Sequence, residues 1–98
     1  MGELTGKKAL VTGGTRGIGK AVALDLADMG ADVAINFFRS RESAKATTAE
    51  IESRGVRALA LRANIGNEEQ IPSMFEQLKA EFGTHKLAVR RSHIEHNV

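Results

Sequence analysis

The sequence contains no cysteine, tryptophan or tyrosine, and only one proline in 98 residues. Without cysteine the chain forms no disulfide and offers no thiolate for catalysis or metal binding. No apolar run approaches the roughly 20 residues that span a bilayer. The N-terminal stretch Met1-Gly2-Glu3-Leu4 also lacks the basic and apolar regions of a signal peptide. We therefore expect a cytoplasmic protein with no membrane partner.

An excess of charge of one sign is also absent from most of the chain. Residues 1–83 hold equal numbers of basic and acidic side chains, so the net charge of +2 comes from the tail, residues 84–98. The tail carries Lys86, Arg90 and Arg91 against Glu95. Three cations without an aromatic residue to stack on a base do not predict a nucleic-acid partner. The tail's three histidines, His85, His93 and His96, have no carboxylate or cysteine arrangement beside them, so we expect no metal site.

A glycine-rich stretch, Thr12–Gly19, connects a short apolar run to an alanine-rich helical pattern. A strand, a glycine turn and a helix in this order present backbone N–H groups and a helix N-terminus to a phosphate. Gly13 would let the chain leave the strand, Gly17 would let a pyrophosphate approach the backbone, and Gly19 would let the helix pack close to the sheet. The spacing is Gly-x-x-x-Gly-x-Gly. The alternative is a purely structural turn between strand and helix.

Apolar runs alternate with helical patterns about every 25 residues along the chain. This alternation predicts right-handed βαβ crossovers and a parallel sheet. We expect strands at 7–11, 32–37 and 57–62, and helices at 17–29, 43–54 and from about 68 to 82, the last with its start distorted by Pro72. Asn67 is suited to cap this last helix.

The spacing of apolar residues also predicts which face of each helix is buried. The expected core-facing residues are Ile18, Val22 and Leu26 in the first helix; Ala44, Thr47 or Thr48, and Ile51 in the second; and Ile71, Phe75, Leu78 and Phe82 in the third.

The order of these features resembles the short-chain dehydrogenase/reductase superfamily. The resemblance rests on Thr12–Gly19, on Asn36-Phe37-Phe38-Arg39-Ser40 after the second strand, and on Ala63-Asn64-Ile65 after the third. Residues 1–83 are most similar to the N-terminal part of bacterial fatty-acid-type reductases, which act on ketoacyl or enoyl thioesters of a carrier protein. The implied fold is α/β, a truncated Rossmann-like βαβαβα unit. Its parallel sheet has three strands, or four if Leu87-Ala88-Val89 also forms one.

The resemblance assigns cofactor-binding roles to the ends of the three strands. Gly13, Thr15, Arg16, Gly17, Ile18 and Gly19 would face the pyrophosphate, its ribose and the nicotinamide, with Ile18 on the nicotinamide side. The adenine would lie against Asn64 and Ile65. The family usually has an aspartate where this chain has Asn64, whose amide can also pair with the edge of an adenine.

The charges after the second strand favour NADP(H) over NAD(H). NAD-preferring proteins place a carboxylate there for the ribose 2′-hydroxyl, whereas residues 36–40 contain no acid and the first is Glu42. Arg39 and Ser40, with Arg16 across the turn, offer donors for a 2′-phosphate. The alternative is that Arg39 and Arg41 are ordinary solvated loop charges.

The resemblance ends after Gly83. The family expects Asn-Asn-Ala-Gly after a fourth strand and later a Tyr-x-x-x-Lys pair, but this sequence has no tyrosine. We therefore expect a dinucleotide-binding half-domain at 1–83 and a poorly ordered basic tail at 84–98, which arose by truncation, a change of frame or an artificial end.

Two functions remain open at this point. The chain is either the NADP(H)-binding portion of a reductase, inactive alone, or a non-catalytic binding or interaction module that keeps the Rossmann fold. Such a module would use the exposed sheet edge or the basic tail for a partner, and the sheet edge could also serve a homo-oligomer.

Overall fold

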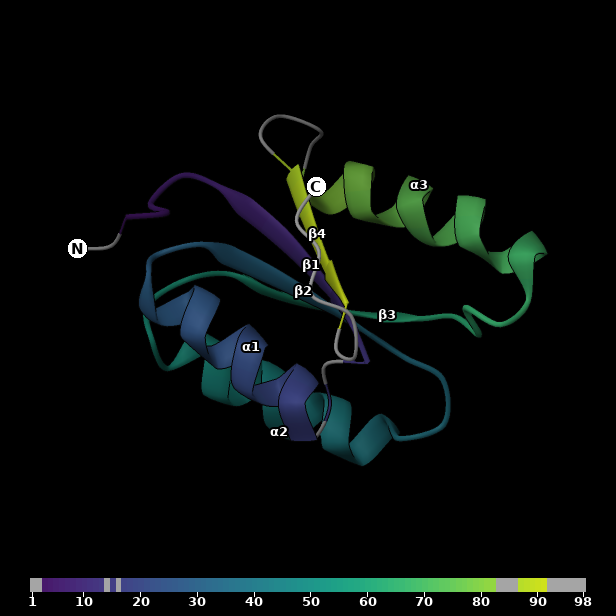
Figure 1. Cartoon of the computed structure of the whole chain (residues 1–98), viewed down its shortest axis with the longest axis horizontal. Coiled ribbons are helices and arrows are strands. Elements are labelled where there is room, and N and C mark those ends of the chain that lie inside the picture. The colour runs from purple at the N-terminus through teal and green to yellow at the C-terminus, as the bar shows by residue number, and fades with distance from the viewer. Residues whose placement is uncertain (1–2, 14, 16, 83–86, 92–98) are drawn as a thin grey trace.

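The computed structural model describes residues 3–13, 15, 17–82 and 87–91, the last five as backbone only. Strands and helices alternate from the first element onward, as the sequence predicts (Figure 1). The elements are β1 (Lys8–Thr12), α1 (Gly17–Asp28), β2 (Asp32–Phe37), α2 (Arg41–Glu52), β3 (Ala58–Arg62), the single 3-10 turn η1 (Glu68–Gln70), α3 (Ile71–Phe82) and β4 (Leu87–Arg91). Among these residues no helix is long and apolar enough to cross a membrane.

The four strands form one parallel sheet in the order β3-β2-β1-β4. The fourth strand, which the sequence left open, therefore lies beside β1. The poor order expected for residues 84–98 stays a prediction, and residues 84–86 and 92–98 lie outside the described part of the chain. The connections run outward from β1 to β3 and then return across β1 to β4. In parallel α/β sheets, this reversal of direction opens a crevice at the carboxyl ends of the strands.

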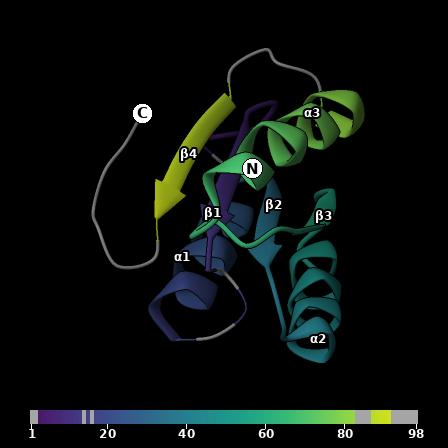
Figure 2. The same ribbon diagram turned by 90° about the vertical axis from the view of Figure 1, so that its right-hand side faces the viewer.

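The sheet is covered on both faces: α1 and α2 lie on one side and α3 on the other (Figure 2). Successive strand residues accordingly point into two separate cores. Val33 and Ile35 contact the core under α1 and α2, while Ala34 belongs to the core under α3. This arrangement explains why β2 is apolar without alternation, since a strand buried on both faces has no solvent side.

The predicted face of α2 is confirmed, and that of α1 is confirmed in part: Leu26 is buried, Val22 packs partly buried against the core, and the prediction for Ile18 is wrong. Ala44, Thr47 and Ile51 are the buried residues of α2. The buried residues of α1 are Gly19, Ala23, Leu26 and Ala27, whereas Ile18 is 70% exposed. Besides Leu26, small residues line this face because they let the helix approach the sheet closely, so large apolar side chains mark it only in part.

The start of α3 is distorted in the predicted way. The side chain of Asn67 accepts a hydrogen bond from the Glu69 N–H at 3.0 Å, and η1 precedes the regular helix. Pro72 is the second residue of α3, where a missing N–H costs no helical hydrogen bond. Leu78 and Phe82 are buried as expected, but the third buried residue is Met74, while Ile71 and Phe75 are only half-buried.

Candidate functional site

The register of the sheet aligns the carboxyl ends of β1, β2 and β3. Thr12 lies opposite Asn36, and Asn36 lies opposite Leu61. The three segments named by the sequence begin within two residues of these positions, so the fold brings them to one edge of the sheet. Arg16 lies outside the described residues. The role of the three segments in binding a cofactor stays a prediction.

The glycine turn leaves β1 through backbone conformations that favour glycine. Gly13 has φ of 70° and Gly17 has φ of 61°, both in the left-handed region. Apart from its chain neighbours and the backbone of its own helix, a Cβ added to Gly17 would meet no atom of the described residues within 4 Å. Gly17 is also the first residue of α1, whose first turn contains no acidic side chain. The helix N-terminus is thus not neutralised by a carboxylate of its own first turn, which suits an anion.

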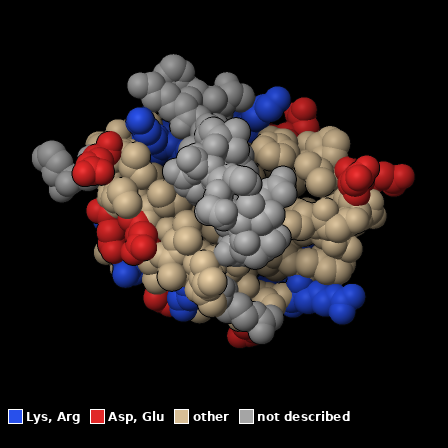
Figure 3. Space-filling model, viewed as in Figure 1, with Lys and Arg blue, Asp and Glu red and all other residues tan. Residues whose placement is uncertain are grey.

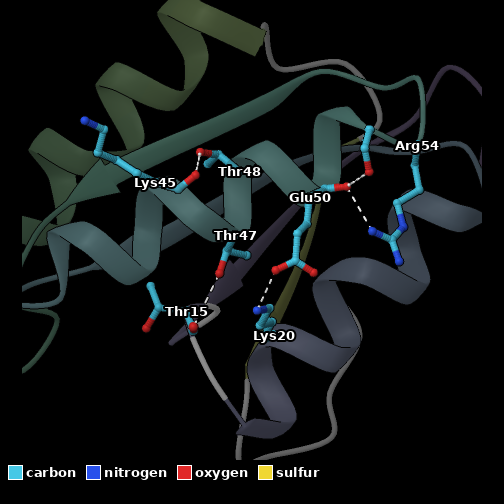
Figure 4. A network of polar contacts seen from close by, with 8 residues as sticks. Thr15, Lys20, Lys45, Thr47, Thr48, Glu50 and Arg54 are labelled. Carbon is cyan, nitrogen blue, oxygen red and sulfur yellow. Dashed lines mark hydrogen bonds and ion pairs between the residues drawn. The ribbon is translucent and has the colours of Figure 1, made fainter.

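A buried threonine of α2 holds this turn from outside. The Thr47 hydroxyl donates to the Thr15 carbonyl at 3.3 Å, as Figure 4 shows. The side chain of Thr47 is fully buried. Beside it, Lys20 of α1 forms an ion pair of 2.7 Å with Glu50 of α2. The helix that follows β2 therefore positions the turn that follows β1, a link that the sequence did not reveal.

Asn36 ties the ends of β2 and β3 together. Its side chain is 4% exposed, and its Nδ2 donates to the Ala63 carbonyl at 2.9 Å. A buried amide must be satisfied by hydrogen bonds, and here the bond fixes the segment that carries Asn64 and Ile65. A polar residue inside an apolar strand was the sequence signal for this role.

The segment after β3 is a compact polar turn. The Asn64 side-chain oxygen accepts from the Gly66 N–H at 2.9 Å, and the Asn64 N–H donates to Gln70 Oε1 at 2.7 Å. The side-chain oxygen thus stabilises its own turn and keeps a second lone pair, while its amide group has no hydrogen-bond acceptor among the described residues. Ile65, which follows, is 39% exposed. Together with Ile18 it accounts for two of the three large exposed apolar side chains in the described ranges.

Arginines gather where β2 and β3 end. The Cζ atoms of Arg39 and Arg62 lie 5.3 and 5.0 Å from the centre of the Phe38 ring, and that of Arg41 lies 5.6 Å from the Phe37 ring. Figure 3 shows basic atoms over the turn between β2 and α2, at the lower right. Arg39 is exposed and Ser40 is half-buried at the start of α2. Sequence reasoning missed Arg62, the last residue of β3.

The tail histidines, His85, His93 and His96, lie outside the described residues. Within the described ranges, no group of three histidine, aspartate or glutamate side chains is placed to hold a metal ion.

Comparisons with known proteins agree with this geometry. The family model of short chain dehydrogenases matches residues 7–89. A 3-oxoacyl-[acyl-carrier-protein] reductase FabG of Staphylococcus aureus is 39% identical over 88 residues, which are 90% of this chain and 36% of the relative. The chain thus spans about a third of the length of the curated relatives it matches.

Two solved structures share the fold. A dehydrogenase/reductase from Sinorhizobium meliloti superposes with a TM-score of 0.84 at 41% identity, over 91% of this chain and 35% of the other. A short chain dehydrogenase from Burkholderia cenocepacia in complex with NADP superposes with a TM-score of 0.78 at 46% identity, over 82% of this chain and 33% of the other.

Proposed function

This chain belongs to the short-chain dehydrogenase family, and from that premise we propose that it is the NADP(H)-binding portion of an oxidoreductase. The similar FabG protein is a 3-oxoacyl-[acyl-carrier-protein] reductase, so thioesters of this kind are the substrate class to test first. When bound, a nicotinamide cofactor supplies the hydride. The residues of this chain bind and orient the nucleotide.

The observation that carries the proposal is the open space over Gly17. The turn begins where the order of strands reverses, and a Cβ at Gly17 would meet no atom within 4 Å among the described residues, its chain neighbours and the backbone of its own helix apart. A pyrophosphate in this space would meet the first N–H groups of α1. The exposed Ile18 and Ile65 offer apolar surface for the rings at the two ends of the nucleotide.

The preference for NADP(H) follows from charge. The turn between β2 and α2 provides Arg39 and Ser40, and the first carboxylate after β2 is Glu42, in the first turn of α2. A carboxylate at residues 36–40 would repel a 2′-phosphate, whereas a guanidinium forms charge-assisted hydrogen bonds with it. Binding of NADPH should therefore be tighter than binding of NADH.

A pair of glycine substitutions tests the site. Gly17 and Gly55 both have positive φ, and among the described residues an added Cβ would meet nothing within 4 Å at either, local backbone apart. Replacement by alanine costs each a similar left-handed strain of about 1–2 kcal/mol. Only Gly17→Ala places a methyl group where the phosphate would lie, so we expect NADPH affinity to fall at least about tenfold in this variant and to be unchanged in Gly55→Ala.

Calorimetric titration with NADPH and thermal unfolding separate the two effects. Equal affinities in the two variants would contradict the proposed site. Absence of nucleotide binding by the wild-type chain, together with stable self-association, would favour the binding module instead.

We also propose that the 98-residue chain does not turn over alone. The family resemblance implies a tyrosine that exchanges a proton with the substrate oxygen, and this sequence contains none. A bound cofactor without a positioned acid gives little acceleration. Incubation with NADPH and a 3-oxoacyl thioester should leave the absorbance of the reduced cofactor constant, and a decrease that scales with protein concentration would refute this.

A further inference from the structure

Two arginines, one in the turn after β2 and one at the end of β3, share one phenylalanine ring at the candidate site. Phe38 follows β2 directly, and Arg62 ends β3, where the register pairs it with Phe37. Arg39 and Arg62 both place a guanidinium within 5.3 Å of the centre of the Phe38 ring. Both distances are within the range of cation–π attraction. Residues separated by 23 positions in the sequence thus hold two positive charges around one half-buried ring.

These charges have no acidic partner among the described residues. The ion pairs there join Lys8 to Asp32, Lys20 to Glu50, and Arg54 to Asp28. Neither Arg39 nor Arg62 takes part in an ion pair or a side-chain hydrogen bond within these ranges. Each guanidinium is attracted to the ring, but the two positive charges add to the local potential. An anion close to both would be attracted by this potential.

The geometry of a guanidinium allows it to contact a ring and an anion together. Its N–H groups lie in the plane of the group, so stacking on an aromatic face leaves them directed outward. The ring limits the conformations of the long side chain before the anion arrives, so less entropy is lost on binding. A phosphate carries enough charge and enough oxygen atoms to accept from two such groups.

We propose that Arg62 is a further arginine for the 2′-phosphate of NADP(H), in addition to Arg39 and Arg16, and that the ring of Phe38 holds it at this site. This inference rests on the proposed function. It makes Arg62 a specificity-determining residue, which weakens NADPH binding when removed and leaves NADH binding unaffected. Cofactor choice would then depend on the end of β3 as well as on the turn after β2.

Arg57, at the other end of β3 from Arg62, provides the matched control. It lies just before β3, at the opposite end of the sheet, and its Cζ lies 4.9 Å from the centre of the Phe82 ring. Unlike Arg62, it donates a hydrogen bond of 2.8 Å from Nη2 to the Glu81 carbonyl. Arg57→Gln therefore removes the same charge and the same kind of ring contact, far from the proposed phosphate.

The experiment measures dissociation constants of NADPH and NADH for the wild-type chain, Arg62→Gln and Arg57→Gln. We expect Arg62→Gln to weaken NADPH binding about tenfold, or about 1.4 kcal/mol, with NADH binding within a factor of two of wild type. Arg57→Gln should leave both constants unchanged. Adenosine 2′,5′-bisphosphate against adenosine 5′-monophosphate repeats the comparison with ligands that differ only in the 2′-phosphate.

The outcomes that contradict the role of Arg62 can be distinguished from those that contradict the proposed function. An unchanged NADPH constant in Arg62→Gln, or equal weakening of both nucleotides, would overturn the role of Arg62 while the proposed function stands. A wild-type chain that binds neither nucleotide would refute the proposed function and this inference with it. If Arg62→Gln does not fold, Arg62→Lys keeps the charge and the apolar stem. Arg62→Lys should retain part of the preference for NADPH over NADH. Full retention of this preference, or an equal loss of affinity for NADPH and NADH, would count against a planar guanidinium contact.

Discussion

The buried hydroxyl of Thr47 offers a sharp test of how the glycine turn is held. It donates to the Thr15 carbonyl across the gap between α2 and the turn (Figure 4). Thr47→Val keeps the branched shape of the side chain and removes only the donor. Thr48→Val is the matched control, because the Thr48 hydroxyl bonds to the Lys45 carbonyl of its own helix in an exposed position.

The expected magnitude follows from the length and burial of the bond. A net intramolecular hydrogen bond contributes about 0.5–1.5 kcal/mol, and a donor–acceptor distance of 3.3 Å is long for a hydroxyl donor. We therefore expect Thr47→Val to lower the free energy of unfolding by about 1 kcal/mol. For a domain of this size, that loss lowers Tm by about 4–8 °C. Thr48→Val should stay within about 0.5 kcal/mol of wild type.

Affinity distinguishes a positioning residue from a merely stabilising one. If the bond holds the turn in its binding conformation, Thr47→Val should weaken NADPH binding about fivefold, the factor that corresponds to about 1 kcal/mol. Thr47→Ser, which restores the donor, should recover the affinity even though it loses a methyl group from the core. Thermal unfolding by circular dichroism and calorimetric titration measure the two effects. A lowered Tm with unchanged NADPH affinity in Thr47→Val would refute the positioning role.

Three other substitutions probe the rest of the fold and site. Leu78→Ala removes a fully buried side chain from the core under α3 and should cost about 2–5 kcal/mol in urea unfolding; a loss below about 1 kcal/mol would contradict this packing. Asn36→Leu leaves the Ala63 carbonyl without its donor and should cost about 1–3 kcal/mol, seen also as faster amide exchange near residue 63. Lys20→Met breaks a half-exposed ion pair and should cost less than about 1 kcal/mol, and this loss should shrink as salt is added.

The sequence was sufficient where a residue's role depends on its neighbours in the chain. The limits of β2, the cap at Asn67 and the distorted start at Pro72 follow from local rules, and the structure agrees. The buried face of α2 was also predictable, and the structure chooses Thr47 over Thr48. The face of α1 was predictable only in part, because close packing against the sheet selects Gly19 and alanines, and counting large apolar side chains gives such small residues no weight.

The contacts that organise the site depend on strand order and register, which one sequence does not encode locally. Thr47 reaches Thr15 only because α2 packs beside α1. Asn36 reaches Ala63 only because β3 pairs with β2. In both cases the sequence indicated a polar residue at a buried position, but its hydrogen-bond partner could be identified only from the fold.

Arg62 shows why a charged residue can be overlooked at such a site. From the sequence it is an outward-facing charge on an edge strand, a common device that prevents edge-to-edge association. That interpretation needs no ligand, so nothing in the sequence alone argues against it. The register changes the argument, because it places Arg62 beside Phe37 and within reach of the Phe38 ring that Arg39 also contacts. The attraction of each guanidinium to the ring accounts for the two contacts, and an anion would account in addition for two positive charges gathered at one ring without a carboxylate among the described residues.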